Sequence, residues 1–219
     1  MKYILDKLNH CTFKKVEAGR LAPRAYAIPH KKSADAKRAD YKNERFNSDV
    51  VSALSGEWEF KYYKKKSKLP ATLDTSKIKF DKITVPSTWQ RTGYEEPVYI
   101  NCPYSFDPRA LGGEKGQGVK PPEIPDDFSC GIYRKWLTID KKAENYVLCF
   151  LGIASCVDLY INGIFVGYGE GSHNSYEFDV SDFLVNGEND ISVKLYTYSD
   201  ATYLEDQDCF RYNGIFICI

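Results

Sequence analysis

The sequence predicts an all-β protein, a jelly-roll β-sandwich preceded by an irregular N-terminal arm. Aromatic residues make up 15% of the 219 residues, with 17 Tyr against one Met, and aromatic side chains favour strands. Short apolar runs with a period of two alternate with turns rich in Gly, Asn and Pro, and no long amphipathic helix is apparent. The connections between these runs differ greatly in length, which fits a jelly roll better than a simple meander.

Two regions are expected. Residues 1–50 lack a sustained period, so we expect an arm that packs over a larger body or is partly disordered. One short helix is expected near 33–42. Residues 51–219 form the predicted sandwich, whose first strand places Trp58, Phe60 and Tyr62 on one face.

Further strands are expected along the rest of the chain. A strand over 78–85 ends at the turn Pro86-Ser87, and the Pro-rich and Gly-rich stretch 101–130 is expected to be a long irregular loop. Asn162-Gly163 separates two alternating runs, which predicts a two-residue hairpin because a type I′ turn needs two positive φ angles. The later strands are expected at 133–139, 146–151, 157–161, 164–168, 191–195 and 215–219.

Charge and hydropathy exclude several kinds of partner. Lys plus Arg equals Asp plus Glu at 30 each, so we expect neither nucleic acid nor an anionic membrane as a partner. The longest apolar run, 147–153, is too short to span a bilayer. Asp6 interrupts the apolar stretch at the beginning of the sequence, so these residues do not resemble a signal peptide.

The cysteines favour a cytoplasmic protein with reduced thiols. There are seven Cys, an odd number, and no Cys-x-x-Cys pair occurs. A zinc site is not expected, because the three His (His10, His30 and His173) are scattered without ligand spacing, and we assign no role to His173.

Four segments resemble the sugar-binding domain that opens family 2 glycoside hydrolases. They are LSGEWEF at 54–60, VPSTWQ with GY and PVYIN at 85–101, GYG with S and EFD at 167–179, and YLEDQD with GIF at 203–216. The resemblance covers 50–219, and the last block points to the β-galactosidase branch of the family.

This resemblance implies a place in a longer enzyme. An immunoglobulin-like domain and a TIM barrel would follow the sandwich, and the barrel would carry the two catalytic Glu of a retaining mechanism. No catalytic residue is therefore expected in this chain, which should be inactive alone. In the intact enzyme, a homo-oligomer acting on β-galactosides, it would supply part of the sugar pocket and subunit contacts.

The resemblance also implies two site residues. Asn101 matches the family Asn that reaches the galactose pocket, and Asp208 matches the family Asp that contacts substrate hydroxyls. A carboxylate accepts charge-assisted hydrogen bonds from hydroxyls, and Asp208 would also help hold a sodium ion, with other ligands in the barrel. Sodium and magnesium are the metal ions considered for the intact enzyme; no cofactor is expected in this chain.

The residues alone leave simpler interpretations open. Asn101 fits a loop residue bonded to its own backbone, and Glu205, Asp206 and Asp208 fit a solvated acidic turn. Glu205 and Asp206 are expected to hold the turn, through Arg211. Their crowding on one short loop disfavours a pair of catalytic carboxylates placed on opposite sides of a glycosidic bond.

The tryptophans and three departures from the family pattern bear on sugar stacking and on the domain junction. Trp58 is expected in the core, and Trp89, just past a Pro turn, is the more exposed candidate for a stacking platform. Phe210 stands where the family has Trp, and Ile217-Cys218 where it has Arg-Asp.

Two rival functions are a free-standing carbohydrate-binding module and a structural domain of a β-glucuronidase or β-mannosidase.

Overall fold

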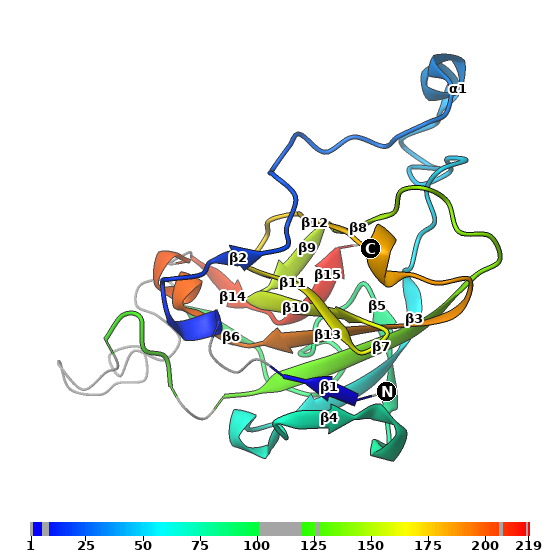
Figure 1. Ribbon diagram of the computed structural model, residues 1–219. Helices are drawn as coiled ribbons and strands as arrows, with labels where there is room; N and C mark the ends of the chain where they lie inside the picture. The colour runs from blue at the N-terminus through cyan, green and yellow to red at the C-terminus, as the bar shows by residue number, and fades with distance from the viewer. Residues whose placement is uncertain (1, 6–8, 101–119, 126–127, 206–207, 218) are drawn as a thin grey trace.

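The computed structural model describes residues 2–5, 9–100, 120–125, 128–205, 208–217 and 219, and its centre is one antiparallel sheet. Seven strands pair in the order β2-β11-β10-β13-β7-β3-β5 (Figure 1). In that order they span Glu17–Ala18, Ile164–Glu170, Cys156–Ile161, Gly187–Tyr196, Cys130–Ile139, Gly56–Tyr63 and Asp81–Val85.

Short ladders form a second layer over one face of this sheet. β12 (Tyr176–Asp179) pairs with β8 (Val147–Phe150), and β15 (Gly214–Ile217) pairs with β9 (Gly152–Ala154). The main core lies between the layers, because apolar side chains from both meet in one buried cluster, which includes Phe60, Phe150, Leu159, Phe178, Val193 and Ile215. The predicted two-layer, all-β architecture is confirmed.

Helical structure is sparse, as the sequence predicts. The single α-helix of the described residues, α1, covers Ser33–Arg38 inside the range expected for it, and none of its residues is buried. Single turns of 3-10 helix lie at Asn9–Cys11, Lys66–Lys68, Thr75–Lys77, Ser181–Phe183 and Asp200–Leu204. None of the helices in the described ranges has the length and hydropathy to cross a bilayer.

The first 50 residues behave in two different ways. β1 (Lys2–Ile4) pairs with β4 (Thr72–Asp74), and β2 pairs with β11 at the edge of the main sheet. The chain from 22 to 50 instead leads away from the sandwich to α1 and returns to β3 (Figure 1). The beginning of the chain is therefore part of the folded body.

The hairpin predicted at Asn162-Gly163 is confirmed. β10 and β11 pair up to Ile161 and Ile164, and the two turn residues have φ angles of 52° and 88°. Positive φ at both central positions is the property that distinguishes a type I′ turn.

Alternation in the central strands does not mark a solvent face. In β10 and β13 the polar residues Asp158, Ser192 and Lys194 alternate with core residues, yet all three are buried. A second cluster covers this outer face, and it contains Tyr3 and Leu5 from the start of the chain, Leu73 from β4, and Tyr160 and Tyr196 from the sheet. Lys194 and Asp158 form an ion pair beneath it.

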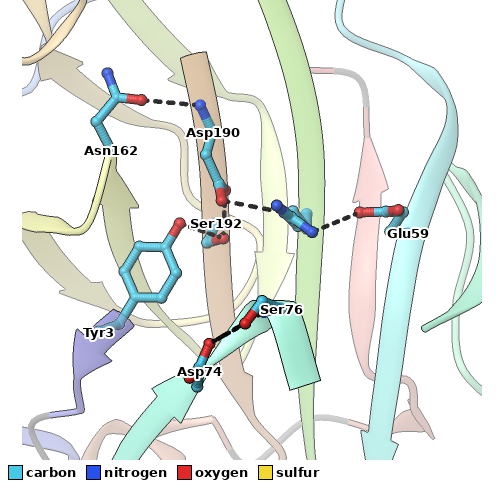
Figure 2. Close-up of polar contacts among 8 residues, drawn as sticks. Tyr3, Glu59, Asp74, Ser76, Asn162, Asp190 and Ser192 are labelled. Atoms are coloured by element: carbon cyan, nitrogen blue, oxygen red, sulfur yellow. Dashed lines mark hydrogen bonds and ion pairs between the residues drawn. The ribbon is translucent and has the colours of Figure 1, made fainter. Parts of the chain in front are cut away.

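A polar network joins three parts of this outer face (Figure 2). Asp190 on β13 accepts from Arg134 Nε at 3.1 Å, and Arg134 Nη1 reaches Glu59 on β3 at 3.3 Å. The Ser192 hydroxyl lies 2.9 Å from Asp190 Oδ1 and 3.2 Å from the Tyr3 hydroxyl. The network therefore links β1 to the middle of the sheet through side chains.

Trp58 and Trp89 are both buried, whereas the sequence predicts burial for Trp58 alone. Trp58 is buried, as predicted, and its Nε1 donates to Leu54 O at 2.8 Å. The prediction for Trp89 is wrong, because its side chain is fully buried beside Phe60, and its Nε1 donates to the Tyr133 hydroxyl at 2.6 Å. The backbone amides of Ser87 and Trp89 donate to Ile215 O and Asn213 O, both at 2.8 Å, which holds the segment after the Pro86-Ser87 turn against the chain around β15.

The buried Arg134–Asp190 pair gives a test of the fold. We expect Asp190→Ala to lower the free energy of unfolding by about 3 to 5 kcal/mol, because it removes the buried carboxylate partner of a largely buried guanidinium and leaves it the partly exposed Glu59. Urea denaturation of the 219-residue chain measures this. Glu57→Ala, which removes an exposed partner of Lys82 on the same sheet, serves as the control and should barely move the midpoint. Equal midpoints for both variants would contradict the interpretation.

Candidate functional site

The candidate site lies on a short exposed ribbon made of β6 (Val98–Ile100) and β14 (Cys209–Arg211). Its register pairs Ile100 with Cys209, Tyr99 with Phe210 and Val98 with Arg211. Asp208, the predicted sugar ligand, immediately precedes β14 and is exposed. The fold thus presents this carboxylate to solvent at one end of the ribbon.

Tyr99 holds the Asp208 carboxylate. Its hydroxyl donates to Asp208 Oδ1, and this hydrogen bond raises the pKa of Tyr99 above its usual range. The two residues are 109 positions apart in the chain, so only the register of the ribbon brings them together. Tyr99 lies inside the family-like segment PVYIN, but no local pattern in the sequence marks it as a partner of Asp208.

Asn101, the other predicted site residue, lies outside the described residues, and its role stays a prediction. It follows Ile100 in the chain, and Ile100 is paired with Cys209, the neighbour of Asp208.

Glu205 braces the segment that carries Asp208, as expected. Arg211 Nη2 lies 3.0 Å from Glu205 Oε2, and Arg211 Nη1 donates to the Glu205 carbonyl at 3.3 Å. The Ser172 amide donates to the other carboxylate oxygen of Glu205. Glu205 is therefore neutralised by a guanidinium and serves the local structure; Asp206 lies outside the described residues.

An aromatic surface adjoins Asp208. The Phe210 ring lies 5.4 Å from Tyr99 and 5.9 Å from Tyr212, centroid to centroid, and is inclined by 29° to the Tyr212 ring. All three side chains are exposed. Although Phe210 departs from the family Trp, it keeps an aromatic group at this place, and flat aromatic surfaces suit the apolar faces of sugars.

A pocket of about 460 Å³ lies beside the ribbon. Val98 and Arg211 of the ribbon form one side, and the rest combines the aromatic residues Tyr62, Tyr94 and Tyr198 with polar and charged side chains. Its volume lies in the range of small-molecule sites, and the carboxylate of Glu95 lines it.

The Asp208 carboxylate has the right chemistry for a hard cation but is a single ligand. Nowhere in the described ranges do three His, Cys, Asp or Glu side chains gather at metal-binding distance. A sodium ion at Asp208 would therefore need oxygen ligands from elsewhere.

A second acidic feature is the pair Glu170 and Asp200, of which Asp200 is buried and Glu170 is partly buried. The Phe13 amide donates to Asp200 Oδ2 at 2.6 Å, while the buried Asp200 Oδ1 has no hydrogen-bond partner among the described residues. Burial, together with a hydrogen bond to Asp200, raises the pKa of Glu170 to about 8. Two carboxyl groups share a hydrogen bond only through a proton, and a small cation could replace that proton.

A family model described as glycosyl hydrolases family 2, sugar binding domain, matches residues 51–219. The chain belongs to this family. Among curated relatives, the β-galactosidase of Actinobacillus pleuropneumoniae is 39% identical over 88% of this chain, and that of Staphylococcus xylosus is 40% identical over 90%. The chain spans 18% of the length of each relative.

Solved structures add little to the assignment of this family 2 domain. A β-D-mannosidase from Dictyoglomus thermophilum is 27% identical over 71% of this chain and 16% of its own, with a TM-score of 0.42. A score of this size carries no argument about substrate.

The raised pKa of Glu170 predicts a pH dependence. The folded chain keeps a proton that the unfolded chain releases above its ordinary value of 4.5, so stability should fall as pH rises from about 4.5 to about 8. Glu170→Gln stays neutral throughout and should remove this part of the slope. Urea midpoints measured with a chelator at about pH 5 and about pH 8.5 test this. An unchanged slope in the variant would show that Glu170 is not the group responsible.

Proposed function

We propose that this domain belongs to a β-galactosidase and supplies one wall of its sugar pocket. The observation that carries the proposal is the near 40% identity to two curated β-galactosidases over about nine-tenths of the chain. The exposed Asp208 supports it, because a carboxylate fixed at the surface by Tyr99 keeps acceptor capacity for sugar hydroxyls.

In this proposal the chain binds and orients the sugar, and the longer protein performs the reaction. Asp208 accepts substrate hydroxyls, and Asn101 adds an amide to the same pocket. The retaining reaction needs two carboxyl groups about 5 Å apart on opposite sides of the bond. Glu205 is paired with Arg211, so the described residues of this loop offer Asp208 no partner for this chemistry, and the 219 residues should be inactive alone.

Metal ions belong to the same proposal. Asp208 would give one oxygen to a sodium ion completed by the longer protein. Glu170 and Asp200 would give two carboxylates to a magnesium ion, which typically takes one or two carboxylates and keeps water ligands. The unpartnered buried oxygen of Asp200 supports this assignment. Among the described residues, the thiols of Cys130, Cys149, Cys156 and Cys209 form no disulfide, which supports a reducing, cytoplasmic location.

A free-standing carbohydrate-binding module is the second candidate. The exposed rings of Tyr99, Phe210 and Tyr212 favour it, because aromatic rings in this setting stack on sugars. The two candidates differ in one measurable respect: a module predicts galactose or lactose binding by the isolated chain in a calorimetric titration, whereas half a pocket predicts none. A β-glucuronidase or β-mannosidase domain is less well supported, because the two curated relatives that match about nine-tenths of the chain are β-galactosidases.

The enzymatic proposal predicts a division of activity. The full-length protein should hydrolyse a chromogenic β-galactoside, and the 219-residue chain should not. Asp208→Ala in the full-length protein should lower kcat/KM by about a hundredfold or more, because charge-assisted bonds to the sugar are lost. Glu57→Ala, which removes an exposed side chain of β3 that pairs with Lys82, is the control and should keep full activity. Turnover by the purified 219-residue chain, or full activity of Asp208→Ala, would contradict the proposal.

The magnesium assignment predicts a ligand-dependent stability. Millimolar Mg²⁺ should raise the Tm of the 219-residue chain relative to a chelator, because an ion that binds only the folded state stabilises it. Asp200→Asn should abolish the increase, and Asp179→Asn, an exposed carboxylate on β12, should keep it. The same increase in both variants would place the ion elsewhere.

A further inference from the structure

Glu95 accepts an unusual number of hydrogen bonds. Its Oε1 accepts from the hydroxyls of Tyr62, at 2.9 Å, and Ser129. Its Oε2 accepts from Gln90 Nε2 at 2.8 Å and from Asn213 Nδ2 at 3.0 Å. The donors are all neutral, and they come from four separate segments of the chain.

These contacts use the whole acceptor capacity of the side chain. An ionised carboxylate offers about four acceptor positions, and four donors occupy them. Although Glu95 lines the pocket of about 460 Å³, it has no acceptor left for a ligand. The carboxylate therefore works as a connection between segments rather than as a binding group.

The connected segments include both strands of the ribbon at one end. Glu95 lies three residues before Val98, where β6 begins, and Asn213 lies two residues after Arg211, where β14 ends. In a further hydrogen bond, the backbone N–H of Asn213 donates to Gln90 Oε1 at 3.0 Å. Tyr62 and Ser129 belong to the sandwich, so the carboxylate fixes the base of the ribbon to the sandwich.

The other end of the ribbon carries Asp208. Its three residue pairs place that end about 10 Å from the base, at about 3.3 Å per residue. A two-stranded ladder of this length is marginally stable by itself. Its direction therefore depends on what holds the base.

We propose that Glu95 is a positioning residue for sugar binding, which fixes the ribbon and through it the Asp208 carboxylate. This inference rests on the proposed function. Glu95 itself does not touch the sugar; it restricts the ribbon to one orientation relative to the sandwich.

Hydrogen exchange in the 219-residue chain tests the connection without activity. Glu95→Ala should speed exchange of the amides in 98–100 and 209–211 by about tenfold or more, while those of β13 change by less than about twofold. Asp74→Ala, which removes the partner of Ser76 far from the ribbon, is the control and should leave the ribbon unchanged. Exchange that rises equally in β13 and the ribbon, or in neither, would overturn the proposal. If Glu95→Ala does not fold, Asn213→Ala removes one of the four contacts and is judged the same way.

A double-mutant cycle in the full-length protein tests the link to Asp208. Glu95→Ala should lower kcat/KM by about tenfold or more, yet add almost nothing in an Asp208→Ala background, because it acts through Asp208. Glu95→Gln should recover most of the loss, since the hydroxyls of Tyr62 and Ser129 accept from an amide. If the two substitutions lower kcat/KM independently, so that their fold-changes multiply in the double variant, the positioning role is overturned. Lack of β-galactoside hydrolysis by the wild-type protein would refute the proposed function instead, and hydrogen exchange would still judge Glu95.

Discussion

Both faces of strands β10 and β13 are buried, so the polar side chains on their outer face need partners inside the protein. Lys194 pairs with Asp158, and Asp190 pairs with Arg134. Ser192 meets the hydroxyl of Tyr3, from the first strand of the chain. The cover and the polar residues beneath it are thus mutually dependent: without β1 and its neighbours, these charges would face water and lose the low-dielectric surroundings that strengthen their pairing.

The candidate site, unlike this covered face, is packed against little of the rest of the protein. Its ribbon has three residue pairs, and Tyr99 and Phe210 are about half exposed. A site of this kind gains accessibility but cannot orient itself by packing. Side-chain connections replace packing here: Glu205 with Arg211 closes the segment around Asp208, and Glu95 holds the base.

Local patterns in the sequence predicted the strands, the Asn162-Gly163 hairpin and the two-layer fold, because period and turn chemistry are properties of neighbouring residues. Burial of Trp89 was missed, since a Pro turn does not reveal whether the chain passes over the core or into it. Burial of the outer face of β10 and β13 was missed, because alternation in a strand shows which residues are polar but not whether another segment packs over them. The contact of Tyr99 with Asp208 depends on strand register across 109 residues, which no local pattern contains.

The carboxylates near the site differ in function because they differ in what already satisfies them. Glu95 is saturated by four neutral donors, so it connects segments; Glu205 is paired with a guanidinium, so it braces a turn. Asp208 has one tyrosine donor and open solvent, which leaves acceptor positions for hydroxyls. Asp200 is buried beside Glu170 with an oxygen unpartnered within the described chain, a condition that a proton or a metal ion relieves. A count of acids along the sequence treats these groups alike, whereas their remaining hydrogen-bonding capacity assigns each a different role.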